Sequence, residues 1–142
     1  MKFSSIVLGL ASALTATAKI SYQVTGFGSG CSPGGCGAGF NVSAPADYLS
    51  GAPAFKFNCA IILGRPYADC TALDGSSPST SKVSAQWRGL SYPYPYGENA
   101  LWVSHVFRGT DAVFNATGYY EYNFQTESPK DFPMQVISVT TA

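Results

Sequence analysis

The chain has 142 residues, of which 46% are hydrophobic, 14% aromatic and 11% charged. This length fits one domain, and the composition excludes a disordered chain, which would be less hydrophobic and more charged. Eight basic residues balance eight acidic ones, so no basic surface is expected to attract nucleic acid. With one histidine and four cysteines, the chain has few of the side chains that metal sites and histidine-dependent catalysis require. We therefore expect no metal site, no cofactor and no catalytic residue.

The N-terminal residues have the pattern of a secretory signal peptide. Lys2 precedes a short apolar run, and residues 15–18 supply a small-residue cleavage site. Cleavage there divides the chain into a signal peptide, residues 1–18, and a single secreted domain, residues 19–142. Because the apolar run is too short for a hydrocarbon core of about 30 Å, we expect no membrane anchor.

Alternating apolar and polar residues mark the predicted strands, and no segment has the period of a helix. The alternation is clear in the first segment, where Ile20, Tyr22 and Val24 are separated by polar residues. In chain order the predicted strands are 19–25, 40–43, 55–63, 82–88, 101–108, 112–116, 120–125 and 134–140. Loops are predicted at 26–39, 44–53, 74–81 and 91–99, and a short helix at 46–49.

Seven or eight short strands separated by Gly, Pro, Ser and Asp predict an all-β fold. The expected architecture is a single-domain antiparallel β-barrel or β-sandwich. Both have the same strand period, so these two architectures stay open at this point.

Four cysteines in an exported chain predict two disulfides, because the secretory route is oxidising. Three pairings are possible. Cys31 and Cys36 flank a turn-forming Ser-Pro-Gly-Gly segment, whereas Cys59 and Cys70 flank a ten-residue excursion. We favour these two nearest-neighbour pairs. Neither spacing contains the C-x2-C pair of a zinc site.

Two N-glycosylation sequons occur, at Asn41 and Asn115. Both are candidates to carry glycan in a eukaryotic secretory pathway. A glycan on either asparagine would mark that face of its strand as exposed to solvent.

His105 is the one histidine, and its neighbour Ser104 suggests a nucleophile and a base. Adjacent residues on a strand point to opposite faces, so these two cannot form a catalytic pair. We expect His105 to be a packed or surface residue. The spacing of the eight carboxylates selects no acid–base pair. A glycine-rich segment from Gly26 leads into Cys31 rather than a helix, which argues against a phosphate loop.

The most unusual segment reads Tyr-Pro-Tyr-Pro-Tyr. Its prolines predict an extended, polyproline-like backbone that displays Tyr92, Tyr94 and Tyr96 from a loop or a sheet edge. Displayed tyrosines suit sugar rings, flat phenolic ligands or a partner protein. Alternatively, the loop folds back over a barrel end and its rings cover the core. Trp102 is a further candidate anchor, whereas Trp87 is expected in the core.

Several segments resemble small secreted ascomycete proteins related to the major allergen of Alternaria. They are ISYQVTGF from Ile20, the first cysteine pair, GFNV from Gly39, FKFNCA from Phe55, YADC from Tyr67, LWVSH from Leu101 and TGYY from Thr117. The resemblance covers most of residues 19–142. It implies a compact extracellular or cell-wall β-barrel, a disulfide between Cys59 and Cys70, and no established enzymatic activity.

The same resemblance implies a role as an allergen, elicitor or effector that engages plant defence proteins or small phenolic ligands. The founding allergen has an additional cysteine that joins two subunits. Here the four cysteines pair off completely, so a monomer or a non-covalent dimer is expected.

Together these observations predict a non-enzymatic secreted fungal protein, effector-like or allergen-like, with a role in virulence. It would bind a host plant protein or a small phenolic ligand in the apoplast or cell wall. The candidate binding residues are Tyr92, Tyr94, Tyr96 and Trp102. A carbohydrate-binding module for cell-wall polymers is the alternative, and a small carboxylate-dependent hydrolase is a weaker one.

Overall fold

The computed structural model describes residues 20–73 and 80–142. The predicted signal peptide, residues 1–18, and most of the loop predicted at 74–81 lie outside the described residues. Within them the protein is all-β, as predicted, and it has no helix that could span a membrane.

In residues 20–73 and 80–142, nine antiparallel strands form one sheet in the order β4-β6-β7-β8-β9-β1-β2-β3-β5. The strands are β1 Ser21–Ser32, β2 Gly35–Ala44, β3 Phe55–Ile62, β4 Ala68–Asp69, β5 Thr71–Ala72, β6 Lys82–Gly89, β7 Glu98–Arg108, β8 Val113–Asn123 and β9 Phe132–Thr141. The count exceeds the predicted seven or eight because β4 and β5, of two residues each, carry no detectable alternation.

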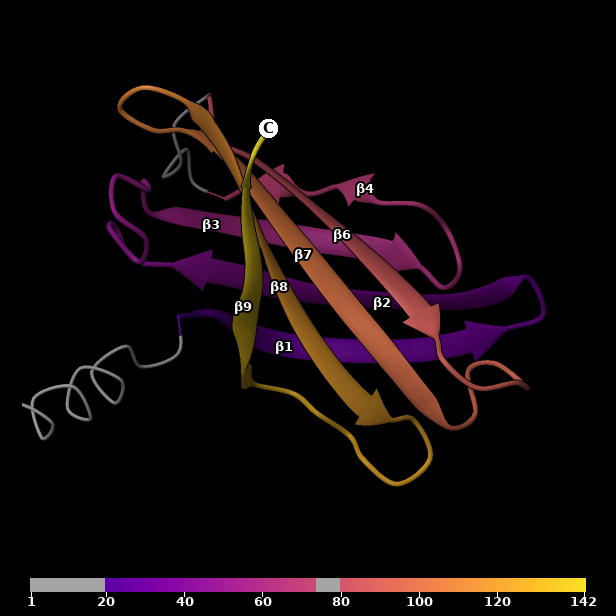
Figure 1. Ribbon diagram of the computed structural model, residues 1–142. Helices are drawn as coiled ribbons and strands as arrows, with labels where there is room; N and C mark the ends of the chain where they lie inside the picture. Colours follow the sequence, from indigo (N-terminus) through magenta and orange to yellow (C-terminus); the bar gives the residue numbers. More distant parts are fainter. Residues whose placement is uncertain (1–19, 74–79) are drawn as a thin grey trace, which may run out of the picture.

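The sheet curls into a nearly closed barrel. In Figure 1, strands β6 to β9 cross over strands β1 to β3. The two groups belong to one ladder, because Tyr22 of β1 pairs with Met134 of β9. A sandwich would consist of two separately hydrogen-bonded sheets. The structure therefore decides between the two predicted architectures in favour of the barrel.

The barrel interior is filled by the alternate strand residues that point inward. Trp87, Tyr22, Leu101 and Met134 are among the fully buried side chains, and Trp87 thus lies in the core as predicted. Burying a large apolar side chain stabilises the fold by roughly 1.5–3 kcal/mol. Because side chains fill the interior, the surfaces available for binding are the barrel ends and the outer face.

The barrel closes at a seam between β3 and β6, where the chain crosses from one strand to the other. Along this crossing, β4 pairs with β6 and β5 pairs with β3. Between the two short strands, Cys70 donates its N–H to the carbonyl of Val83 at 2.8 Å and is disulfide-bonded to Cys59. The N–H of Gly64 donates to the carbonyl of Trp87, also at 2.8 Å. The crossing segment therefore supplies backbone partners to two strands that would otherwise be sheet edges.

Both disulfides have the predicted pairing. Cys31 and Cys36 are directly opposed residues of β1 and β2, next to the hairpin turn. Cys31 is exposed, whereas Cys59 of the second disulfide is fully buried. The first disulfide clamps a surface hairpin, and the second ties the core to the seam.

The loop predicted at 26–39 is wrong, because most of this segment forms β1 and β2. Its glycines carry no side chain that could reveal a strand period. The backbone nevertheless pairs, with Gly28 opposite Gly39 and Gly30 opposite Gly37. Sheet hydrogen bonds join backbone groups, so a neighbouring strand can hold a glycine-rich segment that pattern analysis assigns to a loop.

Two other predicted boundaries differ from the structure. The helix predicted at 46–49 is absent, and the segment forms turns in which Asp47 has a φ of 60°, a value outside the helical region. The strands predicted at 112–116 and 120–125 are one strand, β8. Gly118 takes an inward position between Ala116 and Tyr120 but has no side chain to mark the period, which explains why sequence analysis divided the strand.

Replacing Cys59 and Cys70 together by alanine is expected to lower the free energy of unfolding by about 3 kcal/mol, because the loop-closure entropy that this disulfide removes from the unfolded chain rises with the logarithm of loop length. The Cys31→Ala/Cys36→Ala variant opens a shorter loop and should lose about 2 kcal/mol, so it serves as the matched control. Urea unfolding measures both values. Hydrogen exchange at the Gly64 amide should accelerate only when the seam disulfide is removed. Equal exchange at this amide in both variants would contradict the role of the seam disulfide.

Candidate functional site

The β6–β7 loop, residues 90–97, displays three tyrosine rings to solvent, and we call it the tyrosine loop. Tyr92 is 84% exposed, Tyr94 53% and Tyr96 50%. The rings of Tyr92 and Tyr94 meet edge to face with centroids 5.7 Å apart, and Tyr96 meets Phe124 in the same way at 5.9 Å. The rings are therefore displayed rather than packed over the core, and they support one another in fixed orientations.

A fully buried asparagine anchors the tyrosine loop to the barrel. The side-chain amide of Asn99 donates to the carbonyls of Pro95 at 2.6 Å and of Gly97 at 3.1 Å. A Cβ atom on Gly89 would lie 2.2 Å from the ring of Tyr94. The ring therefore packs directly against Gly89, in space that any other side chain would occupy. The loop is thus held in place before any partner arrives, which reduces the entropy that binding would cost.

The extended backbone predicted for this segment is wrong. Residues 91–97 form consecutive bends and turns, and the Tyr92–Pro93 and Tyr94–Pro95 peptide bonds are cis. At the ends of the loop, the N–H of Leu90 donates to the carbonyl of Glu98 at 2.8 Å. A polyproline helix advances about 3.1 Å per residue, so it could not bring these two ends together.

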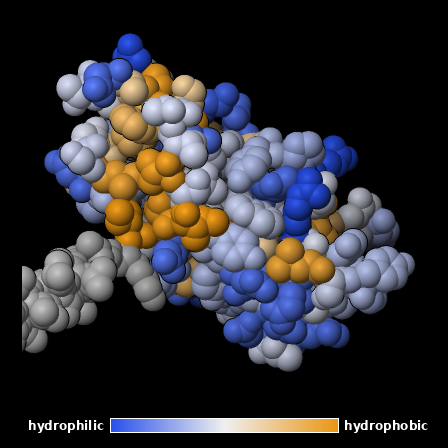
Figure 2. Space-filling model, viewed as in Figure 1, coloured by the Kyte–Doolittle hydropathy of each residue, from blue (hydrophilic) through white to orange (hydrophobic). Residues whose placement is uncertain are grey.

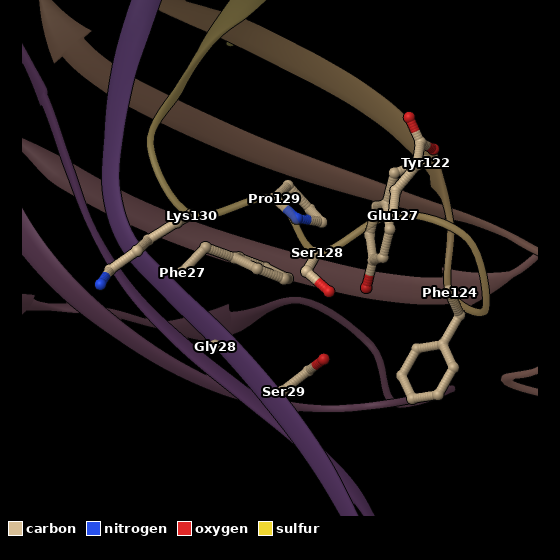
Figure 3. A pocket seen from close by; sticks show the side chains of 9 residues that line it. All are labelled: Phe27, Gly28, Ser29, Tyr122, Phe124, Glu127, Ser128, Pro129 and Lys130. Atoms are coloured by element: carbon tan, nitrogen blue, oxygen red, sulfur yellow. The ribbon is translucent and has the colours of Figure 1, made fainter.

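A pocket of about 470 Å³ opens at the same end of the barrel as the tyrosine loop. Phe27 of β1, Tyr122 of β8 and Phe124 contribute aromatic walls, and the β8–β9 loop contributes Ser128 and Lys130 (Figure 3). Because Phe124 also contacts Tyr96, the pocket and the tyrosine loop form one continuous surface. We call this surface the tyrosine end.

The hydroxyl of Tyr122 lies at the base of this pocket. Tyr122 is 3% exposed, and among the described residues no group meets hydrogen-bonding geometry with its hydroxyl. In Figure 3 the hydroxyls of Tyr122, Ser128 and Ser29 point toward one another. Burial raises the pKa of Tyr122, and the neighbouring polar groups of Ser29 and Trp87 oppose this rise in part. The pocket thus combines aromatic walls with a small group of convergent hydroxyls, which is typical of ligand sites.

His105 lies in the core near the opposite end of the barrel, and its two partners are hydroxyls. Its Nδ1 is 2.6 Å from the hydroxyl of Tyr48, and its Nε2 is 2.6 Å from the hydroxyl of Ser81. A neutral imidazole has one donor and one acceptor nitrogen, so one hydroxyl donates to the ring and the other accepts from it. The rings of Phe55 and Phe107 pack against it with centroids at 4.2 and 4.9 Å.

Ser81 and His105 are hydrogen-bonded as the serine and histidine of a catalytic pair are, but the surroundings of His105 do not favour its action as a base. Burial lowers the pKa of His105 to about 4, which makes it a weak base at neutral pH. Its second nitrogen faces the hydroxyl of Tyr48, whose pKa burial raises to about 12, and not a carboxylate that would stabilise an imidazolium. Ser104 points to the outer face, as the alternation predicts. His105 therefore serves as a hydrogen-bonded core residue.

Trp102, the fourth predicted binding residue, does not belong to the tyrosine end. It projects from the outer face of β7 and lies directly opposite Tyr119 of β8, with ring centroids 5.1 Å apart. The structure thus brings Tyr92, Tyr94 and Tyr96 together and leaves Trp102 on a separate surface.

Most carboxylates are acceptors or ion-pair partners in the surface structure. Six of the seven in the described residues have such contacts, to backbone N–H groups, a tyrosine hydroxyl, an asparagine amide or Lys82: Asp47, Asp69, Glu98, Glu121, Glu127 and Asp131. No group of three or more His, Cys, Asp or Glu side chains in the described ranges is placed to hold a metal ion.

The sequon asparagines are both strand residues with side-chain partners. Asn41 of β2 accepts a hydrogen bond from Asn58 at 2.9 Å, and Asn115 of β8 accepts one from Ser104. Both side chains lie on the outer face of the barrel, and their glycosylation stays a prediction.

Sequence analysis missed three residues that organise the two barrel ends, namely Asn99, Tyr48 and Ser81. All three fall in segments predicted as loops, where the period of two gives no information about burial. Of the three, Asn99 could most easily have been predicted from the sequence. It lies between a turn-rich segment and an apolar strand, where an asparagine side chain often donates hydrogen bonds to the carbonyls of the turns.

Comparisons of the chain with known protein families, with curated proteins and with solved structures find no match. The resemblance to the Alternaria allergen family therefore stays a prediction from the sequence, and function has to be inferred from the site geometry.

Asn99→Ala is expected to destabilise the protein by about 1–3 kcal/mol, because the Pro95 carbonyl loses the buried amide that donates to it, whereas the Gly97 carbonyl keeps the N–H of Phe124. Urea unfolding measures this loss, and Asn58→Ala, which removes an exposed side-chain amide, is the control. Proteolysis should also cut the tyrosine loop faster in Asn99→Ala alone. A loop equally resistant in both variants would show that Asn99 does not hold it.

Stability is expected to fall as the pH drops from 6.5 toward 4. The pKa of His105 is lowered to about 4 in the folded protein, against about 6.5 when unfolded, so the unfolded state binds the proton first. Between pH 7 and 4.5 this histidine accounts for a loss of about 2 kcal/mol. Urea unfolding at pH 7 and pH 4.5 measures the free energy of unfolding. Between these two pH values, His105→Gln should lose about 2 kcal/mol less of it than the wild type does. An identical pH dependence of the two proteins would contradict the assignment.

Proposed function

We propose that the protein is a secreted binding protein that acts without catalysis, and that its partner docks on the tyrosine end of the barrel. One observation carries the proposal: three tyrosine rings, 84%, 53% and 50% exposed, are held on a loop that a buried asparagine anchors. Large exposed aromatic groups cost free energy in an isolated protein and commonly mark an interaction surface.

The geometry favours a protein partner. Tyrosine is enriched in the energetically dominant positions of protein interfaces, because it combines a large apolar area with a hydroxyl. The tyrosine loop projects from the barrel, so its rings suit insertion between the side chains of another protein. Fixed ring orientations, supported by the contact between Tyr92 and Tyr94, fit such a role.

The neighbouring pocket supports a second candidate partner, a small phenolic ligand. Its volume of about 470 Å³ falls in the range of small-molecule sites. Phe27, Tyr122 and Phe124 would stack on a flat ring, and the hydroxyls of Ser29 and Ser128 would hydrogen-bond to phenolic groups. The larger exposed area of the tyrosine loop places this candidate second.

An extracellular location is supported by the two disulfides, which persist in oxidising compartments. The predicted signal peptide and the resemblance to secreted ascomycete proteins support it further. On these grounds we propose an effector-like or allergen-like protein that engages a plant protein in the apoplast or cell wall.

A carboxylate-dependent hydrolase has less support. Six carboxylates are occupied by structural contacts. Glu127 is the one carboxylate among the residues that line the pocket, and it accepts the N–H of Asn123 at 2.6 Å, so the pocket lacks the pair of carboxylates that glycoside hydrolysis uses.

Capture of a plant protein should depend on the tyrosine loop. Residues 19–142, with both disulfides formed, are immobilised and exposed to host-plant apoplastic extract. The Tyr92→Ala/Tyr94→Ala/Tyr96→Ala variant should lose the captured protein, since truncation of central aromatic residues costs on the order of 2 kcal/mol each. Mass spectrometry of the bound fraction measures the capture.

Tyr67→Ala is the matched control, because Tyr67 is 43% exposed but lies outside the tyrosine loop. It should capture as the wild type does, and urea unfolding should show all three proteins equally folded. Capture that survives the triple substitution would rule out the tyrosine loop as the docking surface. Binding of catechol that Phe124→Ala abolishes and the triple variant retains would assign the function to the pocket.

A further inference from the structure

The outer face of strands β6, β7 and β8 carries a second hollow, of about 410 Å³. Short hydroxyl side chains form its floor. Ser84, Ser104 and Thr117 are paired across the three strands and make one continuous row. Neighbouring strands are about 4.8 Å apart, so the row extends over roughly 10 Å. These residues point away from the core, and the hollow is therefore distinct from the pocket at the tyrosine end.

The walls of this outer hollow are polar at one end and aromatic at the side. Asn115 accepts a hydrogen bond from Ser104, which directs its amide. Lys82 and Asp69 form an ion pair of 3.7 Å at the rim, and the ring of Tyr67, which is 43% exposed, borders the hollow. Because the one lysine and the one carboxylate among the lining residues are paired, the hollow has no net charge.

An aromatic platform continues the same face. Trp102 precedes Ser104 by two residues on β7, and Tyr119 follows Thr117 by two residues on β8. Residues two apart on a strand share a face, so the ring pair adjoins the row of hydroxyls. The platform is fixed, since the two rings lie 5.1 Å apart and the Tyr119 hydroxyl donates to Glu121 at 2.9 Å.

The polarity of this face separates it from an apolar docking surface. In Figure 2 the face over β7 and β8 is pale to blue, whereas strongly hydrophobic colour gathers toward the side of β9. The exposed side chains of Ile137 and Val139 on β9 account for hydrophobic surface on that strand. The outer hollow thus offers hydrogen-bonding groups and two aromatic rings without a large apolar patch.

We propose that the outer hollow binds a neutral oligosaccharide. Sugars present hydroxyls that donate and accept, which the hydroxyls and the amide of the hollow match. They also present apolar ring faces, which stack on tryptophan and tyrosine. The absence of net charge in the lining argues against anionic polymers. This site is independent of the tyrosine end, so the protein would hold a cell-wall glycan on its side and a protein partner at its end.

Asn115 links the site to the predicted glycosylation. A glycan on Asn115 would begin inside the hollow and occupy it. The binding test therefore uses residues 19–142 produced in a bacterial periplasm, where disulfides form and N-glycan is not added. Isothermal titration calorimetry is carried out with hexasaccharides of cellulose, β-1,3-glucan, chitin, xylan and mannan, and with polygalacturonate as the anionic probe.

At least one neutral hexasaccharide should bind saturably, and the affinity should fall about tenfold or more in Trp102→Ala, which removes the platform. Ser84→Tyr, which fills the hollow from an outward strand position, should reduce it equally. Tyr92→Ala at the tyrosine end is the matched control and should bind as the wild type does. Urea unfolding confirms that each variant is folded.

Three results would overturn the proposal. The first is no saturable heat with any neutral probe at concentrations up to about 10 mM, a limit that corresponds to roughly 3 kcal/mol of binding. The second is binding that Tyr92→Ala abolishes and both hollow variants retain, which would place the sugar at the tyrosine end. The third is preferential binding of polygalacturonate.

Discussion

Closure of the barrel at the seam between β3 and β6 is the constraint on which the other features depend. The two strands do not pair directly, and the crossing segment supplies both with hydrogen bonds through β4 and β5. Cys70 lies at the centre of this segment. Its N–H donates to the carbonyl of Val83 on β6, and its sulfur is disulfide-bonded to Cys59 on β3. A sheet left open here would expose two edges and the core behind them.

Because the interior of the barrel is packed with side chains, its inward-facing residues stabilise the fold, and only the residues at the ends and on the outer face can contact a ligand. Inward residues such as Trp87 and Leu101 are committed to the core, so a ligand has only the ends and the outer face to contact. The tyrosine loop and its pocket occupy one end, and the row of hydroxyls from Ser84 to Thr117 occupies the outer face. Two binding surfaces with different chemistry can therefore coexist without competing for the same residues.

Buried polar side chains stabilise the two ends of the barrel by hydrogen bonds that hold the loops in fixed positions. The side-chain amide of Asn99 donates two hydrogen bonds to carbonyls of the tyrosine loop. Each ring nitrogen of His105 is hydrogen-bonded to one hydroxyl, that of Tyr48 or that of Ser81. A buried donor that loses its acceptor costs about 1–3 kcal/mol, so these hydrogen bonds hold the loop segments in place. They fix where the loops lie, and in this way the core determines the arrangement of the surface.

The all-β class, the favoured disulfide pairs, the burial of Trp87 and the opposite faces of Ser104 and His105 could all be predicted from the sequence. These depend on local properties: the period of two along a strand, and the short chain distance between paired cysteines. The folded chain was needed to learn that the sheet closes as a barrel, that Ser81 and Tyr48 contact His105, and that Trp102 lies apart from the tyrosine loop. Each of these depends on which distant segments the ladder brings together. Ser81 and Tyr48 also lie in loops, where the period of two gives no information.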